Sequence, residues 1–168
     1  MARPTLHMLI GVPCSGKSTW VDKVVQGPNV YVASTDNLIE AHAQLQGKKY
    51  NDVFKDAIKD AEKTMYTCVQ EAVKDDMSIV WDQTNLNRKT RAKKLIMIPD
   101  HYIKIAVVFP TPNDIWKRLE QRNKWNHHNG KIIPVHVVQH MINSFEYPLG
   151  DEGFDLITIG STQENVHA

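Results

Sequence analysis

The sequence predicts an α/β fold in which helices cover both faces of a five-stranded parallel sheet. Short apolar runs rich in β-branched residues alternate with helical patterns along the 168 residues, and this alternation is typical of parallel strands joined by helical crossovers. The first apolar run also leads into a glycine-rich turn followed by a helical pattern. Because 42% of the residues are hydrophobic and 23% are charged, we expect residues 1–168 to form one globular domain.

The first half of the chain predicts three strands and two helices. The apolar run Leu6–Ile10 predicts the first strand, and the helix Lys17–Val25 follows its glycine-rich turn. Val30–Ala33 predicts the second strand. The long stretch Tyr50–Lys74 has a helical pattern and precedes the third strand, Ile79–Trp81.

The second half continues the alternation. We expect a helix at Lys89–Ile98 and a strand at Ile103–Phe109. Two further helices, Asn113–Asn123 and Pro134–Phe145, precede the last strand, Phe154–Ile159.

A polar segment at residues 123–133 separates the last two predicted helices. It contains the sequence NKWNHHNGK, in which Asn129-Gly130 is a turn signal, so we expect a lid-like loop there. His127 and His128 have no third ligand at a useful spacing and are interpreted as exposed loop residues. Residues 161–168 are expected to form a frayed tail.

The glycine-rich turn carries the strongest motif. Residues 11–18, GVPCSGKS, match the pattern G-x-x-x-x-G-K-[ST] in full, between a strand and a helix as the pattern requires. Backbone N–H groups of such a loop surround phosphates, while Lys17 reaches the β/γ oxygens and the Ser18 hydroxyl binds Mg²⁺. We therefore expect ATP and Mg²⁺ as cofactors. The loop residues assigned to ATP are Gly11, Pro13, Cys14, Ser15, Gly16, Lys17, Ser18 and Thr19.

Asp36 follows the second predicted strand. Ligands of parallel sheets gather at the carboxyl ends of strands, and a carboxylate there can accept the proton of an attacking hydroxyl. The alternative is that Asp36 caps a helix beginning at Asn37, a position that aspartate favours.

A second polar group follows the third predicted strand. Asp82 comes directly after this strand and is the candidate Mg²⁺ residue, together with Ser18. Thr84, Asn85 and Arg91 are candidate acceptor-binding residues, although Thr84 and Asn85 also suit a turn or a cap.

Basic residues gather near the expected lid. Arg118 and Arg122 are i,i+4 neighbours on one helical face, and one of them could close over ATP and stabilise the transferring phosphoryl group. The alternative is an ordinary solvated helix face. We assign Arg122 to ATP binding and, with Lys17 and Asp36, to catalysis.

Composition limits the other possibilities. A net charge of +1 lacks the excess of a non-specific nucleic-acid binder. Cys14 and Cys68 fit neither a disulfide framework nor a metal site, and Leu6–Ile10 is too short for a signal peptide or membrane span. We expect a cytoplasmic protein with no membrane contact.

These residues together resemble the kinase domain of the phage and animal polynucleotide 5′-kinases over nearly the whole chain. Residues 11–20, GVPCSGKSTW, are similar to the phosphate loop of the phage enzyme, and residues 82–87, DQTNLN, resemble the D-x-T-N segment of the family. Arg122-Asn123 resembles the entry to the lid, and residues 145–148 and 152–154 resemble the approach to the last strand.

The resemblance implies a P-loop kinase of three layers that transfers the γ-phosphate of ATP to the 5′-hydroxyl end of DNA or RNA. Asp36 would activate the hydroxyl, Lys17 and Ser18 would bind phosphates and Mg²⁺, and Arg122 would contact ATP. A role in nucleic-acid repair follows from the family, in the host cytoplasm if the protein is encoded by a phage. No D-x-D-x-[TV] signature follows the kinase region, so a 3′-phosphatase activity is not expected.

The acceptor side departs from the family. The phage enzyme has arginines where this chain has Thr35 and Ile39, and an acidic residue in place of Gln83. A second lid arginine is also absent, with Asn126 nearby. A kinase of nucleosides, sugars or antibiotics is therefore the alternative function, because the fold does not specify the acceptor.

Overall fold

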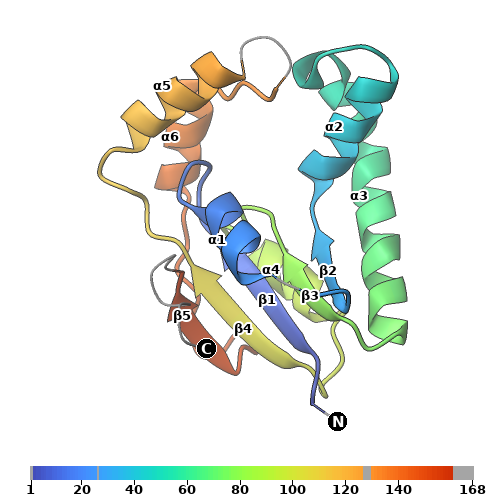
Figure 1. Ribbon diagram of the computed structural model, residues 1–168. Coiled ribbons are helices and arrows are strands. Elements are labelled where there is room, and N and C mark those ends of the chain that lie inside the picture. The colour runs from blue at the N-terminus through green and yellow to red at the C-terminus, as the bar shows by residue number, and fades with distance from the viewer. Residues whose placement is uncertain (1, 26, 127–129, 161–168) are drawn as a thin grey trace.

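The computed structural model describes residues 2–25, 27–126 and 130–160. Its centre is a sheet of five parallel strands, β1 (Thr5–Ile10), β2 (Val30–Ala33), β3 (Ser78–Trp81), β4 (Ile103–Val108) and β5 (Leu156–Ile159). Their order across the sheet is β2-β3-β1-β4-β5 (Figure 1). The predicted α/β class with a five-stranded parallel sheet is confirmed.

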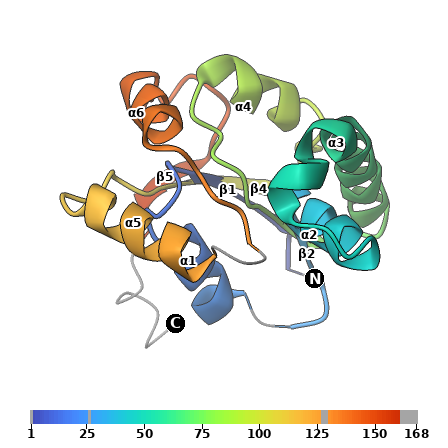
Figure 2. The same cartoon turned by 90° about the horizontal axis from the view of Figure 1, so that it is seen from above.

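Six helices are present in the described part of the chain. They are α1 (Lys17–Val24), α2 (Thr35–Leu45), α3 (Tyr50–Lys74), α4 (Arg88–Leu95), α5 (Ile115–Trp125) and α6 (Val135–Asn143). Figure 2 shows α3 and α4 over one face of the sheet and α1 on the other. None of the helices in the described residues is long and apolar enough to cross a membrane.

The central strand β1 explains why the sheet is buried on both faces. Leu6, Met8 and Ile10 pack with residues of α3 and α4. Leu9 instead packs with Trp20 of α1 on the opposite face. Side chains alternate across a strand, so a strand covered on both sides needs apolar residues on both faces, as Leu6, Met8, Leu9 and Ile10 provide here.

One helix was indicated in the sequence only through the alternative interpretation of Asp36. Helix α2 occupies Thr35–Leu45, and its buried residues Ile39 and Ala43 pack against Tyr50 and Val53 of α3. This tertiary packing stabilises a helix of only 11 residues, which is too short to be stable on its own in water.

The expected boundaries shift near the lid and the last strand. Helix α5 continues to Trp125, so residues 123–125 are helical and not part of a loop. Residues 127–129, which include both lid histidines, and the expected tail 161–168 lie outside the described residues. Strand β5 begins at Leu156, because Phe154 turns into the core beforehand and is only 9% exposed.

Candidate active site

A pocket of about 990 Å³ lies at the carboxyl ends of the strands. Several elements line this pocket. They are the phosphate loop with α1, the first turn of α2, the start of α3, and α5 with the segment after it. The sequence-assigned residues that line it are Pro13, Cys14, Gly16, Lys17, Ser18, Thr19, Asp36, Asp82, Thr84 and Arg122. The fold thus brings together side chains that are far apart in the sequence.

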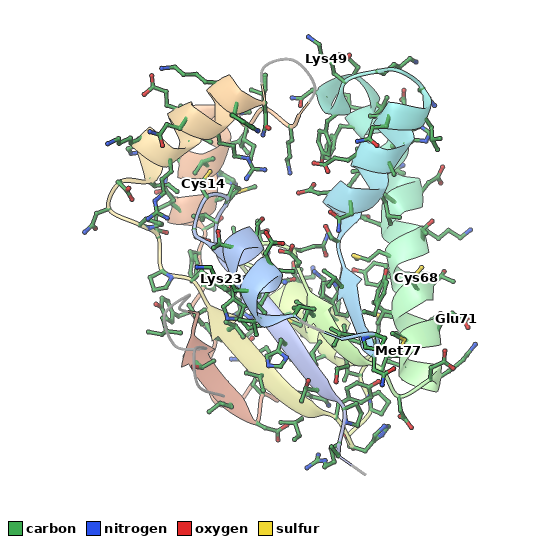
Figure 3. All side chains as sticks on the ribbon, viewed as in Figure 1. Cys14, Lys23, Lys49, Cys68, Glu71 and Met77 are labelled. Atoms are coloured by element: carbon green, nitrogen blue, oxygen red, sulfur yellow. The ribbon has the colours of Figure 1, made fainter. Side chains whose placement is uncertain are left out.

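The loop before α1 has the backbone of an anion-binding nest. Gly16 has φ 102° and Cys14 has φ 64°, and left-handed residues in such a turn aim successive N–H groups inward. Gly11 is also required sterically, since a Cβ there would lie 2.8 Å from Ser15 Oγ and 2.9 Å from Phe109 Cβ. Cys14 itself packs beside Val12 and the apolar cluster under α5 and α6 (Figure 3), consistent with a small apolar residue.

The side chain of Lys17 lies along the same loop. Its Nζ donates to the backbone oxygens of Gly11 at 2.7 Å and Val12 at 2.8 Å. Burial lowers the pKa of Lys17 to about 8, while the nearby Asp82 carboxylate opposes this shift. The ammonium is therefore held at the mouth of the nest, close to where a bound polyphosphate would lie.

Asp36 lies in the first turn of α2, whose N-cap is Ser34. The capping interpretation of Asp36 is therefore wrong, because its carboxylate makes two other contacts. Its Oδ1 accepts a 2.6 Å hydrogen bond from the Tyr50 hydroxyl, and its carboxylate forms an ion pair with Lys131 Nζ at 3.1 Å. The carboxylate is 44% exposed, so a ligand in the pocket can reach it.

Residues 131–133, which we call the strap, cross from α5 to α3 over the pocket. Asn51 of α3 donates from Nδ2 to the Ile132 oxygen and accepts the Ile132 N–H, both at 3.1 Å. Asn123 of α5 makes the equivalent pair of hydrogen bonds to Ile133, at 2.9 and 3.0 Å. Paired bonds from both sides hold the strap backbone, while the Lys131 side chain extends to Asp36.

Asp82 is the partly buried acid at the floor of the pocket. Burial raises its pKa, and the neighbouring Lys17 ammonium counteracts the rise. The Ser18 hydroxyl and the Asp82 carboxylate are oxygen donors of the kind Mg²⁺ prefers, and Mg²⁺ usually takes few protein ligands with phosphate oxygens completing its shell. The described residues hold no cluster of three or more His, Cys, Asp or Glu side chains that could bind a metal. Ser18 and Asp82, with their oxygen donors, fit a magnesium ion whose shell nucleotide phosphates complete.

Two arginines of α5 face the pocket from the opposite side. Arg118 and Arg122 both line it, and Arg118 also pairs with Asp114 at 2.8 Å within its own helix. Arg122 has no such partner among the described salt bridges, and its positive charge acts to lower the pKa of both Lys17 and Tyr50. Its guanidinium is thus available to an anionic ligand.

Two predicted acceptor residues do not reach the pocket. Arg91 is fully buried and forms a salt bridge with Glu152 at 2.8 Å, with further bonds to the Asn85 and Glu146 oxygens. Asn85 is 2% exposed, and its Nδ2 donates to the Leu9 oxygen. Both side chains are saturated by internal partners, so their assignment to acceptor binding is wrong and their roles are structural.

Sequence reasoning missed several residues that surround Asp36. Tyr50 and Asn51 carry no local signal, because each meets its partner only after the α2–α3 turn or the strap has folded. Lys131 ends the polar segment NKWNHHNGK and belongs to no motif of its own. The polar character of the lid segment was the one available hint for it.

The wider relationships of the chain agree with this geometry. Residues 6–148 match the family described as AAA domain. The chain belongs to the AAA domain family. Its sheet order and phosphate loop give it the fold of a P-loop kinase, a group that generally uses ATP and Mg²⁺.

Two curated relatives cover most of the chain. The human heterogeneous nuclear ribonucleoprotein U-like protein 2 is 25% identical over 163 residues, which is 94% of this chain and 21% of the relative. The bifunctional polynucleotide phosphatase/kinase of Schizosaccharomyces pombe is 26% identical over 147 residues, covering 88% of this chain and 31% of the relative. The chain thus spans about a fifth to a third of these proteins.

Solved structures share the fold at low sequence identity. A candidate kinase from Chloroflexus aurantiacus has a TM-score of 0.68 at 16% identity and covers 94% of this chain and 88% of its own. A chain of the Pnkp1/Rnl/Hen1 RNA repair complex has a TM-score of 0.66 at 20% identity, and the match covers 86% of this chain and 44% of that chain. A gluconokinase from Sinorhizobium meliloti has a TM-score of 0.53 at 16% identity, and the match covers 96% of this chain and 85% of that chain.

Proposed function

We propose that this protein is an ATP-dependent kinase that phosphorylates the 5′-hydroxyl end of DNA or RNA. The observation that carries the proposal is the position of Asp36, which lines the same pocket as Lys17 and Ser18 and is open to a ligand. A phosphate-binding loop facing an accessible carboxylate is the arrangement that hydroxyl phosphorylation requires. The relationship to the Schizosaccharomyces pombe phosphatase/kinase supports a polynucleotide acceptor.

In this proposal the loop amides, Lys17 and Thr19 hold the polyphosphate of ATP, and Arg122 approaches it from α5. Ser18 and Asp82 would hold Mg²⁺, which neutralises phosphate charge when bound. Asp36 accepts the proton of the 5′-hydroxyl as its oxygen attacks the γ-phosphorus. The bond between this phosphorus and the β,γ-bridging oxygen breaks, and ADP leaves.

Tyr50 assists by orientation. Its hydroxyl donates to Asp36 Oδ1. Burial is the main cause that raises the pKa of Tyr50, and this hydrogen bond is the second. The phenol therefore stays protonated and keeps the carboxylate in one rotamer, with Oδ2 directed to other partners. Thr84 lies on the pocket wall and remains a candidate acceptor contact.

A kinase of small-molecule hydroxyls is the second candidate. The α2 residues next to Asp36 include Thr35, 6% exposed, and Ile39, which is buried in the core against α3, so neither position supplies an arginine to the pocket. Of the described lining residues outside the phosphate loop and α5, only Lys55 and Lys131 are cationic. This wall offers little charge for a polyanionic strand, and the structural likeness to a gluconokinase agrees with a smaller acceptor.

Transfer of labelled phosphate from ATP separates the two functions. The acceptors are a free nucleoside, a 3′-mononucleotide, a short oligonucleotide and a sugar. We expect kcat/KM to increase with each added phosphate, because a strand-binding channel lowers KM only for acceptors that reach it. Equal efficiency for nucleoside and oligonucleotide, or transfer to the sugar alone, would contradict the polynucleotide proposal.

A further inference from the structure

A buried lysine lies behind the pocket wall. Lys94 of α4 is 3% exposed, yet no carboxylate in the described part of the chain lies within ion-pair distance of it. Its Nζ donates to Gln83 Oε1 at 2.7 Å and to Asn85 Oδ1, and lies 5.1 Å from the centroid of the Trp81 ring. Two amide oxygens and an aromatic face thus take the place of a counterion.

This lysine determines which way the Gln83 amide points. Lysine and the tryptophan indole are donors only, and Trp81 Nε1 also donates to Gln83 Oε1, at 3.2 Å. Two donors converge on one atom, so that atom must be the oxygen. The Nε2 of Gln83 is consequently turned the other way and donates to Thr35 Oγ1 at 3.1 Å.

The amide nitrogen reaches the reactive side of the pocket. Thr35 precedes Asp36 in the first turn of α2, and Gln83 itself lines the pocket. A carboxamide nitrogen carries two hydrogens, and within the described residues only Thr35 accepts one from Gln83 Nε2. The second is available to a ligand beside Asp36.

We propose that Gln83 donates a hydrogen bond to an oxygen of the acceptor close to the attacking hydroxyl, and that Lys94 is a positioning residue that keeps its N–H directed into the pocket. The proposal rests on the hydroxyl-kinase function above. It adds a specificity element, because an acceptor must place a hydrogen-bond-accepting oxygen opposite Gln83. Acceptors lacking that oxygen would leave the amide unpaired.

The test compares KM for the acceptor with KM for ATP in a set of variants. Gln83→Met removes the donor, and Gln83→Glu replaces it with a carboxylate that can pair with Lys94 and preserve the fold. We expect each to raise the acceptor KM about tenfold, the usual scale for one lost hydrogen bond, with KM for ATP unchanged. Lys94→Met removes one of the two donors that hold Oε1 and leaves only the Trp81 indole, so it should also raise the acceptor KM.

The combination of variants identifies the role of Lys94. If it acts through Gln83, Lys94→Met has no further effect on the acceptor KM in the Gln83→Met background. Lys93→Met, on the exposed face of the same helix, is the matched control and should match the wild type. Unchanged acceptor KM in Gln83→Glu, additive effects, or an equal rise in KM for ATP would each overturn the proposal.

The acceptor used is the one that the wild-type protein phosphorylates best. If that acceptor is a nucleoside or sugar, the polynucleotide function is contradicted. The acceptor KM of the Gln83 and Lys94 variants still tests whether Gln83 binds the acceptor. If the wild type transfers phosphate to no acceptor, both proposals are overturned.

Discussion

Lys131 Nζ lies 3.1 Å from Oδ1 of Asp36, although 95 residues separate the two in the chain. The ion pair joins the strap to the first turn of α2, across the pocket. Both side chains are partly exposed, at 27% and 44%, so solvent screens the pair and an incoming anion can displace the lysine. The strap backbone, in contrast, is held by paired hydrogen bonds.

The strap should loosen when one of its two anchors is removed. In Asn51→Ala, the Ile132 N–H loses its acceptor, so its hydrogen exchange should accelerate at least about tenfold, as expected for a lost hydrogen bond. The Ile133 N–H is held by Asn123 and serves as the internal control. Equal acceleration of both amides would mean that the strap opens as one unit.

Lys17→Ala should reduce phosphoryl transfer by more than roughly a hundredfold, since it removes a cation from the site of charge development. The fold should persist, because the hydrogen bonds of the Lys17 side chain go to loop carbonyl oxygens and it belongs to no apolar cluster. Lys23→Ala, on an exposed part of the same helix (Figure 3), is the control. Steady-state kinetics and thermal melting test both expectations, and wild-type turnover in Lys17→Ala would exclude the loop from the mechanism.

Asp36→Asn should keep the affinity for ATP and lower kcat by roughly a hundredfold or more, the usual scale for loss of a general base. The amide can still accept the Tyr50 hydroxyl, so stability should change little. Glu40→Gln, a second acid of α2 that lines the pocket, should retain most activity. A large loss of stability with unchanged kcat would assign Asp36 a structural role instead.

The free energy of unfolding should rise with pH above neutrality. Burial lowers the pKa of Lys94 to about 7 from an ordinary value of 10.5, so the unfolded chain binds more protons than the folded chain between these values. Stability therefore increases from about pH 7 toward pH 10.5, and Lys17 adds to this above about pH 8. Urea unfolding across this range should show a shallower rise in Lys94→Met than in the wild type, whereas Lys93→Met should keep the full rise.

Arg91→Met should destabilise the fold strongly. It leaves the Glu152 carboxylate, 2% exposed, without its partner, and such a loss costs about 3 to 5 kcal/mol. The neighbouring Arg88 pairs with Asp151 on the surface, so Arg88→Met should hardly change the melting temperature. If Arg91→Met instead melted like the wild type and raised only the acceptor KM, Arg91 would be an acceptor residue after all.

The amino-acid sequence determined the fold class and the phosphate loop. Both depend on local information, namely apolar runs of strand length and a short pattern in which Gly11, Gly16, Lys17 and Ser18 have fixed spacing. The positions of Asp36 and Asp82 after strands were also readable, since parallel strands bring their carboxyl ends to one edge.

Only the tertiary structure decided which polar side chains face the pocket. Arg91 and Asn85 follow the third strand as Thr84 does, so the sequence does not distinguish them. In the structure, their polar atoms bond to buried partners instead. Lys131, Tyr50 and Lys94 carry no local signal. They meet Asp36 or Gln83 through contacts between residues that are 11 to 95 positions apart in the chain. The physical reason is that a hydrogen bond or ion pair depends on distance and burial in three dimensions, which residue type and spacing alone do not determine.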